Sequence, residues 1–179
     1  KKLNNMKELL LKSKLTKKLR KKEILSICKL KNTHWKYGIK SQVDWFNENV
    51  QDNDIHNLAY LKERLVGYVS LRKRNFLLKN KKKNYLYFDT LIVSKKHRNI
   101  KIGYALSNLT VNVIKKAKIH SMLVCKKKII SFYEKYKWKK VIQKKSKILD
   151  HKYSKNLSMM CLYRSKDISK HNIKYYIFS

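Results

Sequence analysis

One segment of the sequence combines a basic turn with the start of a helix, as phosphate-binding sites do. It runs Val93-Ser-Lys-Lys-His-Arg-Asn-Ile-Lys-Ile-Gly-Tyr-Ala-Leu106. The unpaired amides of a helix's first turn point at one spot, and the helix dipole adds partial positive charge there. Gly103 would let the backbone approach a phosphate closely, and Arg98 and Lys101 can add charge-assisted contacts. The segment predicts an anion site, although a basic loop before a helix is often simply solvated.

The remaining candidates for chemistry are weaker. Ser131 to Trp138 is rich in aromatic residues, and such a stripe, Tyr133 included, is usually part of a core. The histidines lack the spacing of metal ligands, so we predict no metal. Three cysteines at distant positions lack the pairing expected of a disulfide framework, and we expect reduced core residues. Four acids at positions 44, 48, 52 and 54 could attract a cationic ligand but are typical of a solvated helix face.

The elements that must position these residues follow from hydrophobic periodicity. Residues 85–93 alternate as a strand buried on both faces, and the apolar residues of 102–117 recur at helical spacing. We further predict strands at about 7–12, 55–61, 65–71, 122–125, 138–148 and 157–164, with a lysine-rich loop at 79–84. Helices are expected at 17–32, capped by Thr16, at 42–50, capped by Ser41, and near 129–136. This order predicts an α/β sheet of mixed, largely antiparallel direction with helices on its faces.

Length and charge restrict the class of protein. The 179 residues are 43% hydrophobic, which suits one domain over 1–179 with a core at 7–164 and an uncertain tail at 165–179. Without an apolar run long enough to span a bilayer or to act as a signal peptide, we expect a cytoplasmic protein with no membrane partner. A net charge of +35 would attract nucleic acid. Lysine greatly outnumbers arginine, however, and the composition is typical of an AT-rich genome, so this partner is not favoured.

Three motifs resemble those of the GNAT superfamily of N-acetyltransferases, and two of them, at 98–103 and 132–138, follow each other in the family's order. Arg98-Asn-Ile-Lys-Ile-Gly103 is similar to the family's Arg/Gln-x-x-Gly-x-Gly/Ala motif, which binds the pyrophosphate of acetyl-CoA. Phe132-Tyr-Glu-Lys-Tyr-Lys-Trp138 is similar to the family's Phe-Tyr-Glu-Lys-x-Gly-Phe box, and Leu65-Val-Gly-Tyr68 resembles its hairpin strand. Lys101 and Lys137 stand where the family has glycines. The second change points to a structural effect, because glycine relieves backbone geometry at a helix end.

The resemblance implies a fold and a cofactor site. It implies a GNAT-like twisted sheet of about seven strands, with helices on both faces and a cleft between splayed central strands. Acetyl-CoA would be the acyl donor. Backbone groups of Leu91, Ile92 and Val93 would pair with its pantetheine arm. The phosphates would be bound by Arg98, Asn99, Ile100, Lys101, Ile102, Gly103 and Tyr104.

The resemblance also implies catalytic roles. Tyr133 matches the tyrosine that often protonates the departing thiolate. Asp89 lies where a related enzyme carries a histidine implicated in proton removal, so it could be the base, or else a carboxylate paired with a lysine. The predicted reaction is direct acetyl transfer to a primary amine of a small molecule in a ternary complex. Alternatives are an RNA-linked or protein amine, and a non-catalytic module that binds nucleic acid or CoA. A dimer is compatible with the sequence.

Overall fold

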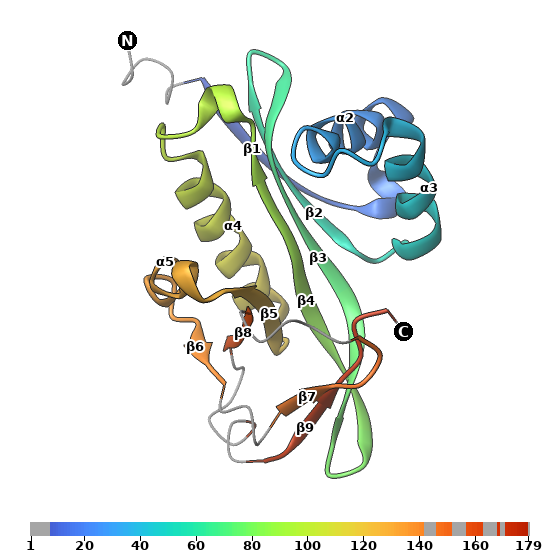
Figure 1. Cartoon of the computed structure of the whole chain (residues 1–179), viewed down its shortest axis with the longest axis vertical. Coiled ribbons are helices and arrows are strands. Elements are labelled where there is room, and N and C mark those ends of the chain that lie inside the picture. The colour runs from blue at the N-terminus through green and yellow to red at the C-terminus, as the bar shows by residue number, and fades with distance from the viewer. Residues whose placement is uncertain (1–7, 142–145, 152–156, 163–167, 169–170, 179) are drawn as a thin grey trace. The chain divides into compact units, whose positions relative to one another are not determined.

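The computed structural model describes residues 8–141, 146–151, 157–162, 168 and 171–178. It has the mixed α/β fold with a mostly antiparallel sheet that the sequence predicts (Figure 1). The elements are β1 (Leu9–Leu15), α2 (Lys21–Asn32), α3 (Ile39–Asn49), β2 (Ile55–Leu61), β3 (Arg64–Leu78), β4 (Lys81–Val93), α4 (Ile102–Ala117), β5 (Ser121–Lys126), α5 (Ile130–Glu134), β6 (Lys139–Lys140), β7 (Ser146–Ile148), β8 (Leu157–Leu162) and β9 (Ile173–Tyr175).

The chain forms two compact units. The first unit consists of Lys1–Arg72 and Thr90–Thr110, and the second of Lys73–Asp89 and Val111–Ser179. Strands β3 and β4 and helix α4 each contribute residues to both units. The expectation of one domain over the whole chain stays a prediction.

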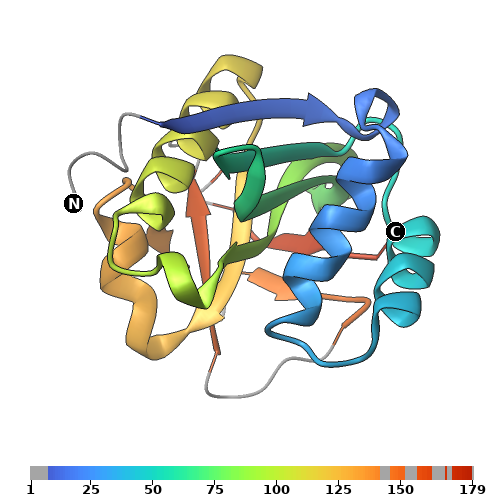
Figure 2. The same cartoon turned by 90° about the horizontal axis from the view of Figure 1, so that it is seen from above.

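In the first unit, helices cover both faces of an antiparallel sheet (Figure 2). Alternate side chains of β2 and β3 point to opposite faces. On one face Leu58 and Tyr68 join α2 and α3 in a core that also contains Ile27, Cys28, Leu30, Phe46 and Ile92. On the other face Gly67 and Asn57 meet α4, where the Asn57 amide donates to the Thr110 hydroxyl at 2.9 Å. The turn of the β2–β3 hairpin is Lys62-Glu63, and β3 begins at Arg64.

Both predicted helix caps are wrong. Helix α2 begins at Lys21, because residues 16–18 form a separate 3-10 turn, and the Thr16 hydroxyl lies 2.8 Å from Nε2 of His56 instead of capping a helix. Helix α3 begins at Ile39 after Gly38, whose φ of +89° suits glycine, so Ser41 lies inside the first turn.

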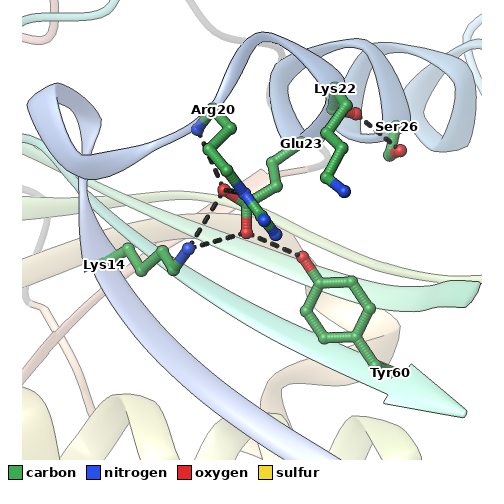
Figure 3. A network of polar contacts seen from close by, with 6 residues as sticks. All are labelled: Lys14, Arg20, Lys22, Glu23, Ser26 and Tyr60. Carbon is green, nitrogen blue, oxygen red and sulfur yellow. Dashed lines mark hydrogen bonds and ion pairs between the residues drawn. The ribbon is translucent and has the colours of Figure 1, made fainter. Parts of the chain in front are cut away.

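Glu23 holds the start of α2 on the strands below it (Figure 3). Its carboxylate accepts hydrogen bonds from the Lys14 ammonium at 2.8 Å and from the Arg20 amide at 2.9 Å. Tyr60 donates to the same group at 3.4 Å. Burial raises the pKa of Glu23, but the hydrogen bonds from Lys14 and Arg20 outweigh it and lower the pKa to about 2. The carboxylate is therefore an anion that locks helix and sheet together.

The second unit contains a sheet whose buried core is rich in aromatic side chains. β4 pairs with β5 in parallel, β5 and β6 pair antiparallel with β8, and β7 pairs in parallel with β9. β9 also pairs antiparallel with the end of β3. The buried core includes Phe76, Tyr85, Tyr87, Met122, Met159, Cys161, Ile173 and Tyr175.

Three sequence-based boundaries in this unit need correction. Residues 81–84 of the predicted loop 79–84 belong to β4, so only Lys79-Asn80 turns the β3–β4 hairpin. The predicted strand 138–148 is two strands, of which β6 pairs with β8 but β7 pairs with β9. The uncertain tail contains β9, which makes nine strands in the described residues where we expected about seven. Residues 142–145 and the end of the predicted strand 157–164 lie outside the described residues.

Candidate functional site

The basic turn after β4 is anchored to β3 at its first residue. The amide of Ser94 donates to the carbonyl of Val66 at 2.8 Å, and residues 95–97 then form a 3-10 turn. The amide of Ala105 donates to the carbonyl of Lys101 at 3.0 Å, which closes the first turn of α4. The amides of the residues before Ala105 are those that a helix leaves without intrahelical partners. Ser94 and Ala105 thus bracket a segment rich in backbone donors.

Two residues of this segment have left-handed backbone conformations. Asn99 has φ of +67° and Lys101 has φ of +62°. Asparagine tolerates this region, but the Cβ of a lysine there comes too close to the following carbonyl oxygen. This steric cost explains why the similar motif has a glycine at the position of Lys101. Left-handed residues next to right-handed ones turn successive amides toward one concave spot, a geometry that binds anions.

The two glycines near α4 have different surroundings. A Cβ on Gly67 would lie 2.7 Å from Cδ1 of Leu106 and 2.8 Å from Cγ2 of Ile102, so this glycine is required for β3 and α4 to touch. A Cβ on Gly103 would meet no atom closer than Cγ2 of Val93, at 3.9 Å. The protein's own packing therefore leaves room beside Gly103.

The predicted cofactor residues are brought together in the first unit and differ in exposure. Ile92 and Ile102 are buried and hold the end of β4 and the start of α4. Leu91, Val93, Ile100 and Gly103 are half-buried, and Arg98, Asn99, Lys101 and Tyr104 are exposed. The sequence from Thr90 to Tyr133 contains no acid, and within the described residues no basic side chain of the turn forms an ion pair. This arrangement can hold a phosphate group on backbone amides with basic side chains around it.

Tyr133 lies in the second unit, in α5, with 6% of its surface exposed. Its ring makes edge contacts with Phe88, at 5.7 Å between centroids, and with Trp138, at 6.4 Å. Burial, together with the Cys125 thiol nearby, raises the pKa of the Tyr133 hydroxyl. The hydroxyl therefore keeps its proton at neutral pH, as a proton donor must.

Asp89 is half-buried in β4, directly after Phe88. Because successive side chains of a strand point to opposite faces, Asp89 points away from the face where Phe88 meets Tyr133. The two predicted catalytic residues thus belong to the same unit but to opposite faces of β4.

Lys137 confirms that the second glycine substitution acts on the backbone. Its φ is +68°, in the turn that ends α5, where its amide donates to the Glu134 carbonyl at 2.9 Å. All three cysteines are buried free thiols, as predicted.

A cationic cluster around Trp45 is a feature that sequence reasoning missed. The Lys31 ammonium lies 3.8 Å from the centre of the Trp45 ring and the Arg72 guanidinium 5.4 Å from it. Lys31 is 7% exposed and Arg72 is 1% exposed. Buried lysine and arginine side chains have no periodic signal of their own, so the pattern of charges could not reveal them.

Two residues of the predicted acidic cluster have partners within the protein. Asp54 is buried and accepts a hydrogen bond from the Gln51 amide, and Asp44 forms an ion pair with Lys40.

A pocket of about 510 Å³ in the first unit surrounds the Glu23 network. It is lined by Leu10, Arg20, Lys22, Tyr60 and neighbouring residues, and includes none of the predicted cofactor residues.

Within the residues that the structure describes, none of the helices has the length and hydrophobicity that a membrane span requires. Nor do the described residues contain three His, Cys, Asp or Glu side chains grouped as metal ligands.

A family model and many solved structures match this chain. The model of the acetyltransferase (GNAT) family matches residues 22–138. No curated protein matches the chain in sequence.

Three of the similar structures show how the likeness extends over the chain. An acyl-CoA N-acyltransferase from Pseudomonas aeruginosa superimposes with a TM-score of 0.65 at 15% identity, covering 86% of this chain and 98% of its own. The GNAT family N-acetyltransferase YhbS from Escherichia coli, solved with CoA, has a TM-score of 0.66 at 11% identity. The match covers 94% of this chain and 89% of YhbS. Naa50 from Arabidopsis thaliana, solved with the bisubstrate analogue CoA-Ac-MVNAL, has a TM-score of 0.56 at 21% identity, covering 87% and 99%. At these identities the likeness establishes the fold.

Proposed function

The chain belongs to the acetyltransferase (GNAT) family, and from this premise we propose that it transfers an acetyl group from acetyl-CoA to a primary amine of a small molecule. The observation that carries the proposal is the backbone between β4 and α4. Left-handed residues at Asn99 and Lys101 lead into a helix N-terminus whose amides can surround a pyrophosphate.

The surroundings of this turn support coenzyme A as the ligand. Arg98 and Lys101 are exposed beside the amides and can pair with phosphate oxygens. The room beside Gly103 allows a phosphate to approach the backbone. YhbS, which has a similar fold, was solved with CoA.

Strand β4 offers backbone groups for the pantetheine arm. Its parallel pairing with β5, within the described residues, includes Leu86, Tyr87 and Phe88. Leu91, Ile92 and Val93 continue the strand beyond these pairs. We infer that their amides and carbonyls bond the amide groups of pantetheine, as an added strand would.

The proposed reaction needs two proton transfers. The amine nitrogen attacks the acetyl carbonyl carbon, a C–N bond forms, and the C–S bond breaks. Asp89 accepts the proton that the nitrogen loses, and Tyr133 donates a proton to the sulfur that leaves as thiolate. The protonated state of the buried Tyr133 supports its role as the acid.

Calorimetric titration of the purified chain with acetyl-CoA tests the proposal. We expect saturable one-to-one binding, weakened about 10-fold by Arg98→Ala, the loss of one charge-assisted contact, and about 100-fold by Gly103→Asp, which places a carboxylate against the phosphates. Lys18→Ala, which removes an exposed charge elsewhere, is the matched control. Absence of saturable binding by the folded protein would refute the proposal. A panel of primary amines, with release of free thiol as the readout, then identifies the acceptor.

A further inference from the structure

The C-terminal strands present a surface that the proposed acetyl transfer does not use. β7 and β9 lie side by side, and β9 lies along the end of β3 (Figure 1). Ile173, Tyr175 and Ile177 point into the core and are 0–3% exposed. The residues between them therefore point outward.

The outward side chains form three rows across the strand pair. Lys147 is paired in register with Lys174, and both are exposed. Beyond them Leu149 is 47% exposed and Tyr176 half-buried. In the last row the exposed rings of His151 and Phe178 meet edge to face, 5.5 Å between centroids. We call this set the outer face: Lys147, Leu149, His151, Lys174, Tyr176 and Phe178.

The charge of the outer face is uncompensated within the described residues. Two lysines directly opposite each other on paired strands repel, which favours an anion bound between them. In the described part of the chain neither Lys147 nor Lys174 forms an ion pair. Asp150, the acid nearest in sequence, uses its two carboxylate oxygens to accept the amides of Ile177 and Phe178 at 2.8–3.0 Å. The negative charge of Asp150 thus faces these two backbone amides.

We propose that the outer face binds single-stranded nucleic acid. Lys147 and Lys174 neutralise backbone phosphates, and Phe178, His151 and Tyr176 provide ring surfaces for bases. Lysine is a point charge, so its contacts with phosphates do not require the fixed geometry of an arginine fork. A sheet surface that combines basic and aromatic side chains matches the way in which sheets bind unpaired strands. The proposal is independent of the acetyltransferase reaction.

Fluorescence anisotropy with labelled 12-nucleotide oligo-U and oligo-dT tests the outer face in the full chain. Between them the two oligomers distinguish RNA from DNA. For Lys147→Gln with Lys174→Gln, we expect the plot of log affinity against log salt to become less steep by about 1.4, since each neutralised phosphate on a single strand contributes about 0.7. Lys115→Gln with Lys116→Gln removes the same charge from exposed positions on α4 and should leave the slope unchanged.

A variant that keeps the charge of the outer face distinguishes base stacking from electrostatic attraction to the phosphates. Phe178→Leu preserves an apolar side chain but removes the ring, and should weaken oligo-U binding at least 5-fold. A 12-base-pair duplex, whose bases are already stacked, should bind less tightly than the single strand at the same salt. Acetyl-CoA affinity should stay the same in every variant of the outer face.

Three outcomes would overturn the inference. Equal losses in the two double-lysine variants would mean that the total charge, not this surface, attracts the oligomer. Unchanged affinity of Phe178→Leu for oligo-U would exclude base stacking. Tighter binding to phosphatidylserine vesicles, lost in Phe178→Leu while oligo-U binding is retained, would assign the surface to a membrane.

Discussion

Gly67 and Leu106 approach so closely that a Cβ on Gly67 would lie 2.7 Å from Cδ1 of Leu106. The Cβ on Gly67 would also lie 2.8 Å from Cγ2 of Ile102. The missing side chain lets the first turns of α4 rest directly on β3. It thereby sets the position of the amides that we propose to bind phosphate.

Gly67→Ala should destabilise the protein by about 1–3 kcal/mol, because a well-packed contact must move to admit the methyl group. Urea unfolding followed by circular dichroism measures the change. Gly103→Ala is the matched control, since its Cβ meets nothing closer than 3.9 Å and alanine favours a helix. We expect Gly103→Ala to leave the free energy of unfolding unchanged or raise it. Equal destabilisation by both substitutions would contradict this account of Gly67.

Tyr133→Phe should lower kcat about 100-fold or more once an acceptor is known, because the substitution keeps the ring packed on Phe88 and Trp138 but removes the proton. Acetyl-CoA affinity should stay the same. Tyr136→Phe, a buried tyrosine three residues later, is the control and should retain kcat. Full activity of Tyr133→Phe would mean that solvent protonates the thiolate.

Lys137→Gly should stabilise the protein by about 0.5–1 kcal/mol. A lysine at φ +68° costs about 1–2 kcal/mol relative to an unstrained backbone, and the greater freedom of glycine in the unfolded chain offsets part of the gain. The control is Lys135→Gly, at φ −56°, where the lysine is unstrained and glycine should destabilise. Thermal melts of the two variants should therefore shift in opposite directions.

The buried histidines His56 and His120 should make the fold sensitive to mild acid. Desolvation by burial lowers the pKa of His56 to about 4, with a further contribution from Lys31, and lowers that of His120 to about 3. Below pH 6.5 the unfolded chain binds protons that the folded chain does not. Stability should therefore be constant above pH 6.5 and fall below it by about 1.4 kcal/mol per pH unit for each histidine.

Urea unfolding at pH 7.5, 6.5, 5.5 and 5.0 measures this slope. His56→Gln and His120→Gln should each reduce it, whereas His34→Gln, on an exposed ring, serves as control. The chosen range stays above pH 4.5, where Glu23 begins to lose its own contribution as its lowered pKa is approached. A slope unaffected by both buried substitutions would show that other groups take up the protons.

The sequence by itself predicted the elements whose periodicity is strong. Strand 85–93 and helix 102–117 follow from alternation and from a sustained apolar stripe, and both are present. The order of the motif segments on these elements was enough to indicate the family. Local capping rules failed at Thr16 and Ser41. The Thr16 hydroxyl is engaged with the distant His56, and the left-handed Gly38 precedes helix α3.

The tertiary structure decided what depends on contacts between distant segments. It paired β7 with β9 rather than extending one strand from 138 to 148, since a three-residue strand gains its stability from its partner and has too few residues for a pattern. It brought Lys31 and Arg72 onto Trp45, and it set Asp89 and Tyr133 on opposite faces of β4. Residue types and local spacing determine helices, strands and motifs, because these depend on neighbours along the chain. The surroundings of each side chain depend on long-range packing, which local periodicity does not encode.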